Sequence, residues 1–380
     1  MVAVKTYMRM IGCMLFLYSA AFLGAILLFK GHTQFRKLLE MGNPSGFEET
    51  LNEMLPVRDN MISPWQKCLS MTRRRYFADS NMFVNDEGQI IKGSDSTISL
   101  EFAFQKVKEL KTYCDSTGRN FLYVFLPGKP YSDEELLKWG IQCKRNAGTN
   151  LMSEYLQQNG ISSFDARTLF SEEDFYQYFF KTDHHWTPDA GLKTARALLE
   201  QLNLRFGYSF EADILDDSQF TRKVVPDKWI GEFGEKALGR YAEKDDFISL
   251  KPSFPVTLRY RNIIRDSEWL EGDFDILLDK EIFNKVKFEG QSMYYYYLPD
   301  AGSVEIENPD VDEGTILIIK DSFSNVMLPY LSLGISHLTA WDMRDDKAVY
   351  DYLKAHPEIE TVMIVYNISF VSTERMNDFQ

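Results

Sequence analysis

The stretch Thr315-Ile-Leu-Ile-Ile-Lys-Asp-Ser-Phe-Ser-Asn325 decides the fold class, because an apolar run ends in polar residues just before a helical pattern. Residues 315–319 are typical of a buried parallel strand, and 323–333 have helical periodicity. A serine at such a turn lies at the sheet edge, where the free N–H groups of the first helical turn would stabilise an oxyanion. Ser322 is therefore a candidate nucleophile, and capping of the helix is the alternative role.

Strands and helices alternate along most of the chain around this stretch. This order predicts an α/β fold with an open, doubly wound parallel sheet, whose reactive groups gather at the carboxyl ends of the strands. Residues 205–310 interrupt the alternation and predict an inserted mixed segment with several antiparallel strands, and residues 83–91 predict a β-hairpin. The other predicted strands are 121–126, 161–166, 337–341 and 361–366, and the predicted helices are 100–114, 150–158, 188–204 and 345–355, with Thr187 as the N-cap of 188–204.

A second polar cluster is the motif Asp183-His-His-Trp186, which contains two of the five histidines of the chain. A serine nucleophile needs a general base, and the base needs a carboxylate that fixes its tautomer. In an extended segment, side chains two positions apart share a face, so Asp183 and His185 form the expected pair and His184 points the other way. Diverging histidines make a metal site unexpected here. Structural histidines in a polar loop are the alternative.

The N-terminal segment Met10 to Phe29 is a run of 20 uncharged, mostly apolar residues. A helix of this length spans about 30 Å, the thickness of the bilayer interior. The run lacks a small-residue cleavage site, which favours an uncleaved signal anchor over a cleaved signal peptide. The sequence thus predicts a single-pass protein of the cell membrane with an extracytoplasmic body. Expected boundaries are 1–30 for the anchor, 31–95 for a helical linker and hairpin, and 96–370 for the α/β domain.

Charge and cysteine content narrow the functional classes. The formal net charge of −14 makes nucleic acid an unlikely partner, because phosphate contacts need clustered Lys and Arg. The four cysteines form no C-x-x-C pair, which argues against structural zinc. A disulfide between Cys114 and Cys143 is possible outside the cytoplasm.

The motif Asp183-His184-His185-Trp186 resembles the name-giving motif of the DHHW family. That family is similar to the AlgJ and AlgX proteins of alginate O-acetylation, which are SGNH-like and carry the Asp-x-His-Trp element before the serine element. Further segments resemble the same family in the same order. They are 47–59, the Pro-x-Lys element within 125–129, and the nucleophile block 316–325, where Lys320 stands in place of the usual glycine.

The resemblance implies an SGNH-like O-acetyltransferase that acts on an exported cell-surface polysaccharide. Ser322 would carry the acetyl group, His185 would act as the base and Asp183 would orient it. No cofactor or metal is implied. The expected partners are a polysaccharide acceptor and a membrane-bound O-acyltransferase that supplies acetyl groups. An acetyl esterase and a non-catalytic polysaccharide-binding scaffold remain alternatives. Candidates for substrate or oxyanion contacts are Lys129, Asn325 and Trp186, with packing under the motif as the other role for Trp186.

Overall fold

A computed structural model describes most of the chain beyond residue 75. The described residues are 76–77, 81–94, 99–138, 140–237, 244–265, 267–281, 296–298 and 302–380. The predicted anchor and the greater part of the predicted linker lie outside these residues. Among the residues that the structure describes, no helix combines the length and the apolar character that crossing a bilayer requires.

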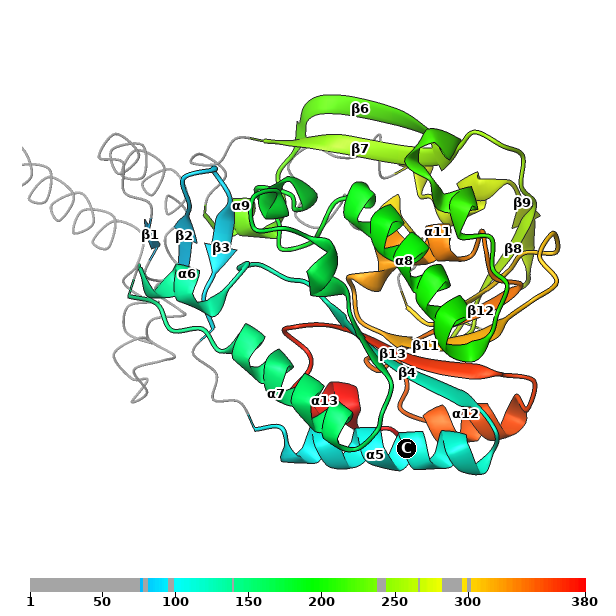
Figure 1. Cartoon of the computed structure of the whole chain (residues 1–380). Helices are drawn as coiled ribbons and strands as arrows, with labels where there is room; N and C mark the ends of the chain where they lie inside the picture. Colours follow the sequence, from blue (N-terminus) through cyan, green and yellow to red (C-terminus); the bar gives the residue numbers. More distant parts are fainter. Residues whose placement is uncertain are drawn as a thin grey trace, which may run out of the picture. The chain divides into compact units, whose positions relative to one another are not determined.

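An eight-stranded sheet forms the centre of the described chain (Figure 1). Its strand order is β5-β4-β13-β11-β12-β10-β8-β9, and the first five of these strands run parallel. The predicted parallel α/β sheet is therefore confirmed. The strands are β4 (Asn120–Leu126), β5 (Ser163–Asp165), β8 (Leu258–Asn262), β9 (Leu270–Gly272), β10 (Val304–Glu307), β11 (Thr315–Lys320), β12 (His337–Asp342) and β13 (Thr361–Asn367).

The inserted segment contributes to this sheet, which the sequence did not predict. Strands β8, β9 and β10 extend the sheet in antiparallel pairing beyond β12. Among the described strands of this segment, β6 (Phe220–Trp229) and β7 (Asp245–Pro252) form a separate antiparallel pair. The predicted hairpin near the N-terminus is present as β2 (Met82–Val84) and β3 (Ile90–Lys92), and β1 (Tyr76–Phe77) pairs with β2.

Helices cover both faces of the sheet, because alternate side chains of each buried strand point to opposite sides. On β11, Ile316 and Ile318 pack in one apolar cluster with α8 and α11, whereas Leu317 and Ile319 pack in another with α5, α7, α12 and α13. Figure 1 shows these helices on the two sides of the sheet. The helices are α5 (Glu101–Ser116), α6 (Asp133–Leu137), α7 (Arg145–Gln158), α8 (Pro188–Phe206), α9 (Glu232–Lys236), α11 (Ser324–Leu331), α12 (Val349–Ala355) and α13 (Glu374–Asn377).

The structure adds to two finer details of the predicted elements. Thr187 occupies the N-cap position of α8, but its hydroxyl makes no capping hydrogen bond. Cys114 and Cys143 are buried and unbridged. The disulfide that the sequence left open is not formed, and the two thiols belong to different apolar clusters.

Candidate active site

Ser322 lies at the turn between β11 and α11, at the carboxyl end of the parallel sheet. Asp321 fixes this turn, since one carboxylate oxygen accepts the N–H of Phe323 at 2.8 Å and the other accepts the N–H of Asn367 at 2.6 Å. Asn367 ends β13, so the turn is tied to the neighbouring strand. Burial outweighs these two hydrogen bonds and raises the pKa of Asp321 to about 6.

Asp183, His185 and Ser322 form a continuous chain of hydrogen-bonding side chains. His185 Nδ1 lies 2.7 Å from Asp183 Oδ1, and His185 Nε2 lies 3.1 Å from Ser322 Oγ. The His185 backbone N–H also donates to Asp183 Oδ1, at 2.9 Å. Ser322 keeps 8% of its surface exposed. The structure therefore brings together all three residues that the sequence nominated.

Asp183 is fully buried, and two residues that the sequence analysis missed make its burial possible. Glu232 donates its backbone N–H to Asp183 Oδ2 at 2.9 Å. Gly231 leaves room for the carboxylate, because a Cβ there would lie 2.6 Å from Asp183 Oδ2. Burial alone would raise the pKa of Asp183, but His185 and its hydrogen bonds hold that pKa well below its usual value. No local sequence pattern indicates this role of Gly231, which is 48 positions away from Asp183.

Two buried side chains, those of Lys129 and Asp245, hold the loop before His185 through hydrogen bonds to its backbone. Lys129 donates to the carbonyl groups of Ile90, Phe180 and Asp183. Asp245 of β7 accepts the N–H groups of Lys181 and Thr182 at 2.6 and 2.8 Å. Lys129 was a candidate for substrate or oxyanion contact, and the structure places its ammonium under the loop backbone instead.

The other two candidates for substrate contact, Trp186 and Asn325, are also buried and support the structure of the site. Trp186 is fully buried and donates its indole N–H to the carbonyl of Phe323 at 2.9 Å, which fits the packing role. Asn325 is fully buried, and its side-chain oxygen accepts from Lys320 at 2.9 Å. Both side chains support the turn that carries Ser322.

Lys320 fits the place of the usual glycine because its side chain turns into the protein. Its ammonium lies 3.0 Å from Asp342 Oδ2, at the end of the neighbouring strand β12. Its φ is not positive, so this turn does not require a glycine. Burial lowers the pKa of Lys320, and Asp342 opposes that shift.

The first turn of α11 was predicted to offer free N–H groups to an oxyanion. This prediction is wrong for three of these groups, which already donate hydrogen bonds within the turn. Phe323 donates to the Asp321 side chain, Ser324 to the Asp321 carbonyl and Asn325 to the Ser322 carbonyl. The turn closes on itself because an acidic side chain and two carbonyls lie within reach of these donors.

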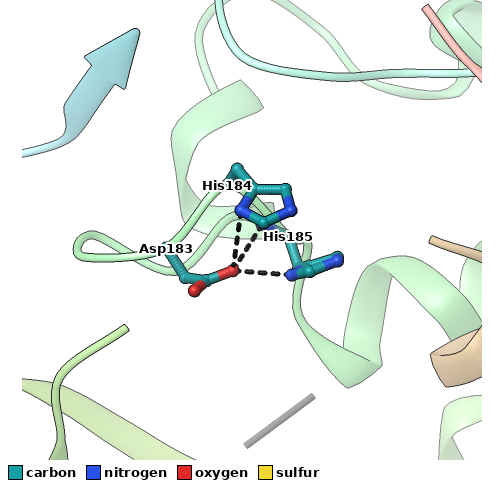
Figure 2. Close-up of side chains that lie close together, drawn as sticks. All are labelled: Asp183, His184 and His185. Carbon is teal, nitrogen blue, oxygen red and sulfur yellow. Dashed lines mark hydrogen bonds and ion pairs between the residues drawn. The ribbon is translucent and has the colours of Figure 1, made fainter. Parts of the chain in front are cut away.

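His184 lies beside His185 and does not point away from it, as Figure 2 shows. The two rings are 3.8 Å apart between centroids, and His184 Nδ1 is 3.5 Å from Asp183 Oδ1. The expectation of opposite directions failed because the loop bends here and does not form an extended strand. Asp183, His184 and His185 each offer a possible metal-ligating atom, and these atoms lie within 4.8 Å of one another.

Comparison with known structures defines the class of fold. PatB1 of Bacillus cereus is 18% identical, with a TM-score of 0.63 over 79% of this chain and 99% of PatB1. A DHHW family protein from Eubacterium siraeum is also 18% identical, with a TM-score of 0.55 over 78% of this chain and 96% of its own. The chain thus has the fold of these proteins, an SGNH-like α/β fold with a mostly parallel sheet.

Sequence comparison defines the family. Residues 79–292, more than half of the chain, match the family described as SGNH hydrolase-like domain, acetyltransferase AlgX, and the protein belongs to this family. The matched range includes Asp183 and His185 and ends before Ser322. Alginate biosynthesis protein AlgX of Pseudomonas aeruginosa is 35% identical over 69 residues, which are 18% of this chain and 14% of AlgX. The family resemblance inferred from the motifs is confirmed.

Proposed function

We propose that this protein is an O-acetyltransferase that acetylates an exported polysaccharide through an acetyl group on Ser322. The observation that carries the proposal is the unbroken series of hydrogen bonds from Asp183 through His185 to Ser322. Membership of a family described as acetyltransferases supports acyl transfer as the reaction. The tight packing of Asp183 supports its role as the group that orients His185.

The reaction takes place in two steps at the same atoms. Ser322 Oγ attacks the acetyl carbonyl carbon of the donor while its proton passes to His185 Nε2. The tetrahedral intermediate then breaks the bond to the donor oxygen, which leaves with the proton from His185. A sugar hydroxyl next gives its proton to His185 and attacks acetyl-Ser322. The acetyl ester forms on the sugar, and the Ser322 oxygen regains its proton.

The setting of the reaction is part of the proposal. The apolar run 10–29 supports an N-terminal membrane anchor with the described domain on the extracytoplasmic side. A membrane-bound O-acyltransferase would then supply acetyl groups at the membrane surface. Co-purification of such a protein with the full-length chain from detergent extracts, and its loss when residues 1–30 are deleted, would support this arrangement.

The decisive experiment compares Ser322→Ala with Ser324→Ala. Ser324 is a matched control because it lies in the same turn, is fully buried and has a hydroxyl without a hydrogen-bond partner. With an activated acetyl ester as donor and an oligosaccharide as acceptor, Ser322→Ala should lower transfer on the order of 10³-fold or more. Trapped wild-type protein should carry an acetyl adduct on Ser322 by mass spectrometry.

Two outcomes would contradict the proposal. If Ser322→Ala retained full acetyl transfer, Ser322 would not be the nucleophile. Release of acetate with no acetylation of any added glycan would identify the protein as an esterase that uses the same three residues with water as acceptor.

A further inference from the structure

His184 has no role in the proposed reaction, although it lies in the middle of the site. Its Nδ1 is buried and has no hydrogen-bond partner. The same atom lies 3.5 Å from Asp183 Oδ1 and 3.6 Å from Glu232 Oε2. A ring nitrogen that faces two carboxylate oxygens and makes no hydrogen bond is an arrangement that suits a metal cation.

Two ligand separations match those around a four-coordinate zinc ion. Bonds of about 2.0–2.2 Å at tetrahedral angles place neighbouring ligand atoms roughly 3.3–3.6 Å apart. The two measured separations from His184 Nδ1 fall in this range. Imidazole nitrogen together with carboxylate oxygen is a ligand set that zinc accepts, and water would complete the coordination.

Charge and access also suit a cation at this place. The carboxylates of Asp183 and Glu232 supply negative charge, and the Lys236 ammonium, which is paired with the other oxygen of Glu232, offsets part of it. The side chains of His184 and Glu232 are 29% and 23% exposed, so an ion can enter from solvent.

We propose that Asp183, His184 and Glu232 form a binding site for Zn²⁺, and that the bound ion inhibits the enzyme. Asp183 Oδ1 is the oxygen that lies 2.7 Å from His185 Nδ1. A cation on this oxygen competes for the negative charge that orients His185 and stabilises its protonated form during acyl transfer. The metal site goes beyond the proposed function, since zinc binding does not require that Ser322 react.

Zinc binding is tested first by titration calorimetry on the full-length protein, with ZnCl₂ as the probe. Wild type and Ser322→Ala should bind one ion with equal affinity, so that a failure of the acetyltransferase proposal leaves this test intact. His184→Gln and Glu232→Gln should each weaken binding by at least ~10-fold. His356→Gln is the matched control, because His356 is paired with Glu358 outside the site and should bind zinc as wild type does.

Inhibition is then measured with an activated acetyl ester, and each variant is compared with its own zinc-free rate. Zinc should inhibit wild type and His356→Gln, and a chelator should restore the rate. His184→Gln and Glu232→Gln should require at least ~10-fold more zinc for the same inhibition, whereas Mg²⁺ should not inhibit any of the four proteins. Unchanged zinc affinity or unchanged inhibition in both site variants, or no binding to wild type, would overturn the proposal.

Discussion

Asp321 shows how a single buried carboxylate positions the candidate nucleophile. It accepts one backbone N–H from the Ser322 turn and one from the end of β13. Because burial raises its pKa to about 6, Asp321 takes up a proton in the folded protein at a pH where an exposed aspartate stays ionised. Protonation removes an acceptor from the turn, so the local geometry depends on pH in mildly acidic solution.

The residue-scale prediction concerns Asp321→Asn, which keeps the shape of the side chain but cannot titrate. A group with a raised folded pKa stabilises the protein fully below its unfolded pKa, and this stabilisation is lost as pH rises through the folded pKa. The unfolding free energy of wild type should therefore increase relative to Asp321→Asn as pH falls from about 6 to about 4, by up to ~3 kcal/mol. Urea unfolding of both proteins across this range measures the difference, and a constant difference would contradict it.

The sequence identified the three central residues, but not the functions of the residues around them. Asp183, His185 and Ser322 were found because acyl-transfer chemistry requires their residue types in local patterns. The role of Lys129 under the loop depends on carbonyl groups 39 to 54 positions away, which no local pattern reveals. The predicted direction of the His184 side chain was wrong for the same reason, since Asp245 and Lys129, which are distant in sequence, hold the loop in a bent form.

At the scale of elements, the packing of α8 against α11 sets the separation of base and nucleophile. Helix α8 begins three residues after His185, and α11 begins two residues after Ser322. The helices approach closely at Gly191, where a Cβ would lie 3.1 Å from the carbonyl oxygen of Val326. A change in this helix spacing therefore acts directly on the 3.1 Å contact between His185 and Ser322.

We expect Gly191→Ala to lower acetyl transfer about 10-fold or more with only a modest loss of stability, because α8 must move by a few tenths of an ångström. Gly207→Ala is the matched control. Gly207 ends the same helix with φ of +77° and has open space around it, so alanine there should cost about 1 kcal/mol without displacing the helix. Kinetics and thermal melts of both variants separate the two effects, and equal activity losses would refute the link between helix spacing and activity.

The alternation of strands and helices was predictable because β4, β11 and β13 each contain a continuous apolar run. The pairing of β8, β9 and β10 was not, since it depends on contacts with β12 that are distant in sequence. The helix bounds shifted by a few residues, most clearly for α7, which begins at Arg145 and not at residue 150.

At the scale of the whole molecule, the two apolar clusters keep the described cysteines apart. Cys114 is fully buried on α5, and burial raises the pKa of its thiol to about 12. Such a thiol is protonated and shielded in the native state, so it reacts only when the surrounding cluster opens.

Cys114 should therefore remain unmodified by a thiol reagent in native protein and react fully in denaturant. Its labelling rate at intermediate denaturant should follow global unfolding, as measured by peptide mapping and circular dichroism in parallel. Fast native labelling, or a peptide that links Cys114 to Cys143, would show that the two clusters are not closed as described.

The separation of 137 positions between His185 and Ser322 affects how the proposed activity arises in a newly made chain. A segment that contains β6 to β10 must fold before imidazole and hydroxyl can meet, and closing so long a loop carries an entropic cost. During N-to-C synthesis the histidine emerges well before the serine. An unfinished chain therefore lacks the complete site, and the three side chains come together in one late step of folding.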